Sequence, residues 1–222
     1  MSPRSFRVLS ALSGIVGVLM LIVSFSINPG PPPDATTEQL TAFGQQYFAS
    51  VLWGAWLQAV GPVLIVLFAF ALVVLAGATG RLAGWMTFFG GTILVMVSLE
   101  EITFYFGALF SDPPSMALIS MALGHAVQHL YFIVAAPALF LPLGVVVVGS
   151  RVLPAVLGYL ALVLGAVFAI LGVVSLFSLV LPSAVTAFAA VQAFWWLAAA
   201  IVLIVRPDPA LAKETGTVGV AP

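Results

Sequence analysis

The sequence predicts an all-α protein, a polytopic membrane bundle of six transmembrane helices. The chain has 222 residues, of which 63% are hydrophobic and 6% are charged, and its mean hydropathy is +1.27. A water-soluble domain of this size could not bury so much apolar surface. Runs of apolar residues long enough to cross a bilayer follow one another along the chain. We place these spans at roughly 8–27, 46–78, 82–110, 115–148, 153–180 and 183–205.

Prolines, glycines and charged residues separate the six runs. The boundary signals are the proline-rich stretch 28–34, Arg81, Asp112, Arg151 and Pro182. The first run has a basic start, as signal peptides do, but its apolar stretch exceeds a typical signal core, so we predict a retained helix. Residues 1–205 then form one transmembrane domain with a polar loop at 27–46. The tail 206–222 is predicted to be short, cytoplasmic and disordered.

Every basic residue falls on one side of this predicted bundle. They precede the first span, lie between the second and third and between the fourth and fifth, or follow the sixth: Arg4, Arg7, Arg81, Arg151, Arg206 and Lys213. The positive-inside rule then predicts a multi-pass protein of the plasma (inner) membrane with both termini in the cytoplasm. The layout resembles that of small six-helix bacterial membrane proteins.

Composition also limits the partners and cofactors. The chain has no cysteine, which excludes disulfides and thiolate metal sites, and its net charge of −1 argues against a nucleic-acid surface. The expected partner is the lipid bilayer, with other membrane proteins or a second copy of the chain left open. Residues 7–14 resemble residues 151–158. This similarity indicates either three repeated helical hairpins or chance in an apolar sequence.

Ionisable residues inside the third and fourth spans are the most informative feature, because such groups usually mark a site or a pathway. They are Glu100, Glu101, His125 and His129. Each pair lies about ten residues, or roughly 15 Å, from the same membrane face, which is near the middle of a core of roughly 30 Å. Gln58 and Gln192 are predicted at a similar depth. We call this set the polar layer.

Helical spacing indicates which of these side chains face inward. His125, Gln128 and His129 share one face of their helix. Glu101 shares a face with Ser98 and Tyr105, and Glu100 lies about 100° away. We therefore predict that Glu101 is the inward carboxylate and that it faces His125 and His129 across a hairpin of the third and fourth spans.

Two prolines are predicted to free backbone carbonyls at membrane depth. Pro62 has no N–H, so the carbonyl of Gln58 loses its helical partner, and Pro137 does the same to Ile133. A freed carbonyl in the membrane has to find a protein group, water or an ion.

Three interpretations of the polar layer remain open from the sequence, and whether the protein is an enzyme is undecided. His125, His129, Glu101 and Glu100 could hold a single divalent metal such as Zn, Fe or Mn, because two histidines and a carboxylate suit these ions. The same groups could relay protons for a small cationic or apolar ligand. Gln58, Gln128, Gln192, Tyr105 and Ser98 would support either site. The third interpretation is a structural or accessory membrane subunit whose polar layer only packs helices.

The outer loops are predicted to attract cations. They carry Asp34, Glu38 and Asp112 and no basic residue. We therefore expect a cationic or neutral ligand to enter from outside or laterally from the outer leaflet.

Overall fold

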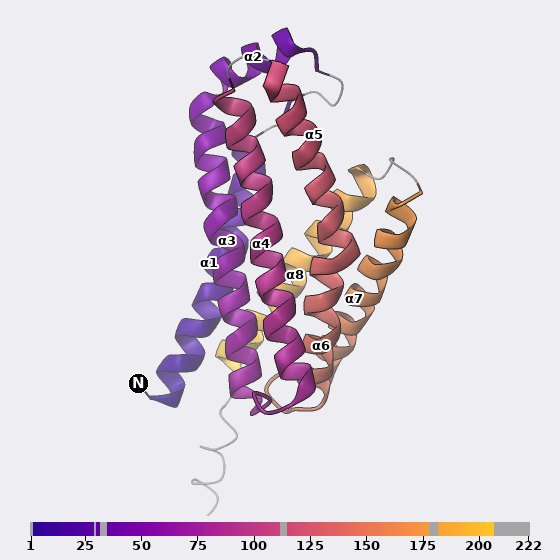
Figure 1. Ribbon diagram of the computed structural model, residues 1–222. Coiled ribbons are helices and arrows are strands. Elements are labelled where there is room, and N and C mark those ends of the chain that lie inside the picture. Colours follow the sequence, from indigo (N-terminus) through magenta and orange to yellow (C-terminus); the bar gives the residue numbers. More distant parts are fainter. Residues whose placement is uncertain (1, 29, 32–34, 112–114, 178–181, 207–222) are drawn as a thin grey trace, which may run out of the picture.

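In the computed structural model the described residues are 2–28, 30–31, 35–111, 115–177 and 182–206, with only the backbone of 182–189 (Figure 1). All regular secondary structure in these residues is helical. The elements are α1 (Pro3–Ile27), α2 (Thr37–Gln46), α3 (Phe48–Leu75), α4 (Leu82–Leu109), α5 (Ser115–Leu130), the π-helix η1 (Tyr131–Ala135), α6 (Ala136–Val148), α7 (Ala155–Ser175) and α8 (Pro182–Val205).

The helices have the length and composition of a membrane helix bundle. Five stretches of the described residues are long and apolar enough to span a membrane, namely α1, α3, α4, the continuous stretch α5–η1–α6, and α7. The predicted sixth span corresponds to α8, whose fully described apolar part is the shorter Ala190–Val205. Large apolar side chains such as Phe89 and Ile170 are about 60% exposed on the bundle surface. Lipid accounts for such a surface, which a soluble monomer rarely shows.

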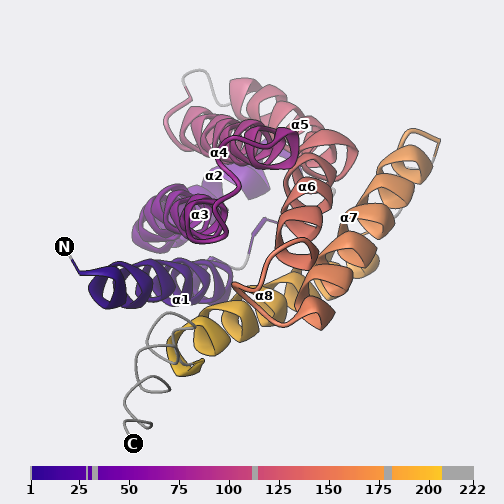
Figure 2. The same ribbon diagram turned by 90° about the horizontal axis from the view of Figure 1, so that it is seen from below.

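Successive helices pack side by side around the bundle (Figure 2). Helix α1 packs on α3, α3 on α4, and α4 on both α5 and α6. Helix α7 packs mainly on α6, and α8 returns to pack against α1. The third and fourth predicted spans are therefore neighbours, as the short connection between them suggested.

Glycines allow the closest helix crossings. A Cβ atom on Gly17 of α1 would lie 2.6 Å from the carbonyl oxygen of Gly61 on α3. A Cβ atom on Gly90 of α4 would lie 2.1 Å from the carbonyl oxygen of Ala138 on α6. Both distances are too short for any side chain, so these helices touch backbone to backbone, as is common in membrane bundles.

An aromatic cluster fills the centre where α3, α6, α7 and α8 meet. Phe68, Phe140, Phe168 and Trp196 are each no more than 1% exposed. Trp195 lies edge-on to Trp196 with ring centroids 4.7 Å apart. Edge-to-face contacts of this kind add to the energy of apolar packing. The cluster ties α8 to the rest of the bundle.

The predicted polar loop 27–46 contains a helix, α2, which the sequence interpretation missed. Its start is fixed by a capping box: Gln39 donates its backbone N–H to the Thr36 hydroxyl at 3.3 Å, and Thr36 donates its own N–H to Gln39 Oε1 at 2.9 Å. None of its residues is buried. Helix α2 lies across the end of the bundle where α3 begins (Figure 1).

The fourth predicted span is one continuous helical stretch, but its middle is the π-helix η1. Here the N–H of Ala136 donates to the carbonyl of Tyr131, five residues earlier. Pro137 follows directly and cannot donate to Ile133. The widened turn therefore coincides with the position where the sequence predicts a break in the hydrogen-bond ladder.

The described basic residues gather at the end of the bundle opposite α2. They stand at the start of α1, in the α3–α4 and α6–α7 connections and at the end of α8: Arg4, Arg7, Arg81, Arg151 and Arg206. Arg7 donates to the carbonyl oxygens of Leu203 and Arg206 at 3.1 and 2.9 Å. The beginning of α1 and the end of α8 are thus held together at one end.

Candidate functional site

The Glu101 carboxylate is the centre of the polar layer and joins three helices. Its Oε2 accepts a hydrogen bond from Gln58 Nε2 on α3 at 2.9 Å. Its Oε1 accepts one from Gln128 Nε2 on α5 at 2.7 Å. We call Glu101, Gln58 and Gln128 the Glu101 site. Each carboxylate oxygen has its own neutral amide donor from a different neighbouring helix.

The proline in α3 connects this site to a second hydrogen bond between helices. Pro62 leaves the carbonyl of Gln58 without its helical donor. The hydroxyl of Ser98 on α4 donates to that carbonyl at 3.1 Å. Of the three partners that the sequence left open for this freed carbonyl, a protein group, water or an ion, the structure has a protein group. Gln58 is only 7% exposed and Ser98 is 9% exposed, so this pair lies away from lipid.

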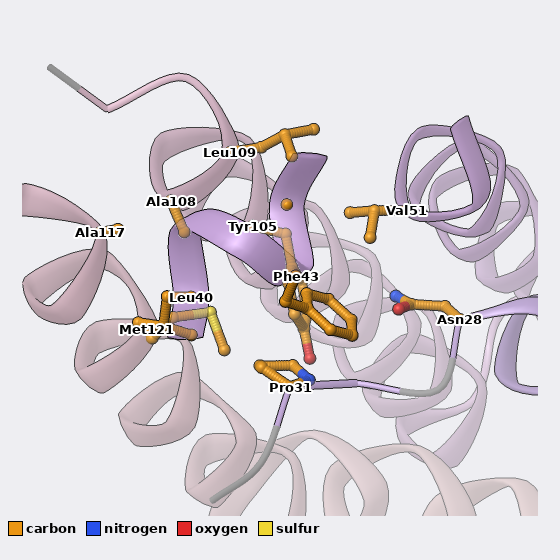
Figure 3. Close-up of a pocket in the computed structure, with 11 residues that line it drawn as sticks. Asn28, Pro31, Leu40, Phe43, Val51, Tyr105, Ala108, Leu109, Ala117 and Met121 are labelled. Carbon is orange, nitrogen blue, oxygen red and sulfur yellow. The ribbon is translucent and has the colours of Figure 1, made fainter. Parts of the chain in front are cut away.

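Tyr105 lies one helical turn beyond Glu101 towards α2. It shares a face of α4 with Glu101, because the two residues are four positions apart. Its side chain also lines a cavity between α2 and the ends of α3, α4 and α5 (Figure 3). Tyr105 is therefore the residue that the Glu101 site and the cavity have in common.

The structure separates the predicted metal ligands into different environments. Glu100 and His125 are exposed, His129 is half-buried, and the glutamines occupy both oxygens of Glu101. Glu101 was predicted to face the two histidines, but in the structure both of its carboxylate oxygens accept hydrogen bonds from glutamines. In the described part of the chain, no three His, Asp or Glu side chains come together as a group able to hold a metal. A divalent-metal site stays a prediction from the sequence.

The rotation of α5 explains why a glutamine stands where histidines were expected. Gly124 is buried, and a Cβ atom there would lie 3.6 Å from Phe104 Cβ on α4. Gln128 follows Gly124 by four residues and so lies on the same face. His125 and His129 each come one residue later, about 100° around the helix. The face of α5 that carries Gly124 and Gln128 therefore meets α4.

Gln192 belongs to a second polar pair rather than to the Glu101 site. The Tyr131 hydroxyl, in η1, donates to Gln192 Oε1 on α8. Tyr131 was not among the predicted residues. It follows Gln128 by three residues in an otherwise apolar stretch, and this spacing was the available signal. Polar groups therefore run from α3 through α4 and α5 to α8, as two hydrogen-bonded sets.

Comparison of the chain with protein-family models, with curated proteins and with solved structures found no match. The function therefore has to be argued from the residues of this chain.

Proposed function

We propose that this protein is a multi-pass protein of the plasma membrane that binds and releases protons at Glu101. The observation that carries the proposal is that both oxygens of the Glu101 carboxylate accept hydrogen bonds from neutral amides on two other helices. No Lys or Arg occurs between residues 82 and 150, so no Lys or Arg of α4 or α5 can form a permanent ion pair with Glu101. Ionisable groups in such positions are functional candidates by default.

Glutamine partners suit a carboxyl group that changes its protonation state. A side-chain amide offers two N–H donors and one carbonyl acceptor. An ionised Glu101 accepts from the amide nitrogens, and a protonated Glu101 can donate to an amide oxygen after the amide turns over. The same three residues can therefore satisfy both states without an unpaired polar group, which would be costly at this depth.

A structural role is the second candidate, and one observation favours it. The bonds of the Glu101 site and the Ser98 to Gln58 bond join three helices. Interhelical hydrogen bonds of this kind contribute about 0.6 kcal/mol each in membranes, and at most about 2. Under this interpretation the protein is an accessory subunit of a membrane complex, and neutralising Glu101 would change stability slightly and transport not at all.

The deciding experiment compares Glu101→Gln with Glu100→Gln in purified protein reconstituted in liposomes. Infrared spectra across a pH titration should show a carboxyl C=O band that Glu101→Gln removes and Glu100→Gln keeps, because Glu100 is exposed on the helix surface. Proton flux under an imposed pH gradient should fall at least tenfold in Glu101→Gln only. Equal flux in the folded wild type and in folded Glu101→Gln protein would overturn the proposal.

A further inference from the structure

The cavity next to Tyr105 lies at the α2 end of the bundle and is roofed by α2. Its volume is about 40 Å³. Leu40 and Phe43 of α2 cover it, Ala108 and Tyr105 come from α4, and Met121 comes from α5 (Figure 3). Since one water needs roughly 10–15 Å³ of such volume, the cavity has room for about three waters.

Two polar side chains point into this largely apolar space. The amide of Asn28, just after α1, faces the cavity, and the Tyr105 side chain extends into it between Phe43 and Pro31 (Figure 3). Waters in a cavity need polar partners as well as room. An amide, a hydroxyl and the neighbouring waters themselves supply such partners.

Tyr105 lies between this cavity and the proposed proton site at Glu101. It is four residues after Glu101, so the two side chains are neighbours on one helical face. Gln128 of the facing helix α5 donates to Glu101. Beyond Tyr105, the next ionisable group along this face of α4 is the Glu101 carboxyl.

The charge at this end favours cations. Glu38 on α2 is exposed, and a backbone hydrogen bond and the Thr36 side chain hold its pKa below the usual range, so it is negative at neutral pH. Asp34 and Asp112, which the sequence also assigns to this end, lie outside the described residues. The described basic residues stand at the opposite end of the bundle.

We propose that the cavity beneath α2 is the water-filled entrance through which protons reach Glu101, with Tyr105 as the positioning residue between them. The inference rests on the proposed function of Glu101. A hydronium ion in the cavity gives its proton to the carboxylate, which leaves water and a carboxylic acid. Tyr105 orients the last water, and its own O–H bond is kept.

Single cysteines test whether the cavity holds water, and the chain has no cysteine to interfere. In the reconstituted protein, Ala108→Cys and Met121→Cys should react with a small cationic methanethiosulfonate reagent at least tenfold faster than Ala122→Cys. Ala122 is the matched control, because it adjoins Met121 but is exposed on the helix surface where lipid lies. Modification at Ala108→Cys should also reduce proton flux at least fivefold. Slow labelling at both cavity positions, or labelling without loss of proton flux, would overturn the proposal that the cavity is the entrance.

Tyr105→Phe tests the positioning role and separates the two proposals. The variant keeps the ring that packs in the cavity wall and loses only the hydroxyl. We expect proton flux to fall at least fivefold while the Glu101 carboxyl band remains in the infrared spectrum. If the Glu101 band is present but proton flux in Tyr105→Phe equals that of the wild type, the proposed entrance is wrong and the proposed proton site at Glu101 is kept. If the wild type lacks the band, the proton site itself fails.

Discussion

At the scale of single residues, Glu101 depends on partners that the surrounding lipid cannot replace. A carboxylate without hydrogen bonds is strongly disfavoured in an apolar environment. Hydrogen bonds to a charged group are stronger than hydrogen bonds between neutral groups. Gln58 and Gln128 each supply one such bond. The chemistry of Glu101 is therefore set by α3 and α5 as much as by α4.

Thr36 is predicted to stabilise the start of α2 and, after a backbone hydrogen bond, to contribute to the lowered pKa of Glu38. In Thr36→Ala the cap hydrogen bond is lost, which costs α2 about 1 kcal/mol. The pKa of Glu38 should rise towards its ordinary value, because the hydroxyl that stabilises the carboxylate is gone. The contribution of Glu38 to stability is present above its unfolded-state pKa and is lost as the pH falls through the lower folded-state pKa. Thr36→Ala should therefore lose less stability in acid than the wild type.

The measurement is an NMR titration of the Glu38 carboxyl carbon in nanodiscs. Thr41→Ala is the control, since the Thr41 hydroxyl only donates to the carbonyl of Thr37 within the helix. An unchanged Glu38 titration in Thr36→Ala, or an equal shift in both variants, would show that the cap does not set this pKa.

At the scale of elements, α4 packs against its neighbours at two glycine positions, one where it crosses α6 and one where it crosses α5. Gly90 brings α4 against the backbone of α6, and Gly124 brings α5 against α4. The first crossing has no room for a methyl group, and the second has ordinary van der Waals space. The π-helix η1 lies between these crossings in the chain and adds a wide turn before Pro137. The relative rotation of α5 and α6 is thus determined locally.

Substitution of these two glycines should have opposite effects. In Gly90→Ala the new methyl would meet the Ala138 carbonyl at 2.1 Å, and backbone cannot easily move away. We expect a loss of about 1–3 kcal/mol, as for other overpacked sites. In Gly124→Ala the nearest atom is 3.6 Å away, and alanine favours the helix by up to about 1 kcal/mol over glycine. Unfolding in mixed micelles measures both, and similar stabilities for the two variants would contradict the crossing geometry.

At the scale of the whole molecule, charge is distributed between the two ends. The described basic residues stand at one end, and the exposed Glu38 stands on α2 at the other. The positive-inside rule then predicts that the basic end is cytoplasmic. Arg7 also joins α1 to the end of α8, which keeps the start of α1 and the end of α8 on that side.

Single-cysteine labelling in intact cells tests this orientation. Thr41→Cys on α2 should react with a membrane-impermeant maleimide added outside. Gly80→Cys, in the α3–α4 connection, should react only after the membrane is opened. Both positions are exposed, and a side chain at Gly80 meets no atom within 4 Å, so neither change should disturb the fold. The opposite labelling pattern would invert the topology and place the entrance beneath α2 in the cytoplasm.

The sequence by itself determined the features that depend on neighbouring residues in the chain. The long apolar runs predicted the membrane helices, because length and hydropathy suffice to recognise a span. Pro62 predicted a free carbonyl at Gln58, and helical spacing separated the inward Glu101 from the exposed Glu100. The short connection between α4 and α5 indicated that these two helices are neighbours.

Only the tertiary structure decided which faces of the helices meet. Rotation about a helix axis depends on which residues pack across each crossing, and on α5 the buried residues next to Gln128 are Gly124 and Val127. Gln128 therefore reaches Glu101 in place of His125 and His129, although all three lie on one broad face by spacing alone. The pairing of Tyr131 with Gln192 joins segments 61 residues apart, and no local pattern specifies it. The cavity beneath α2 likewise exists only because several helix ends converge on Tyr105.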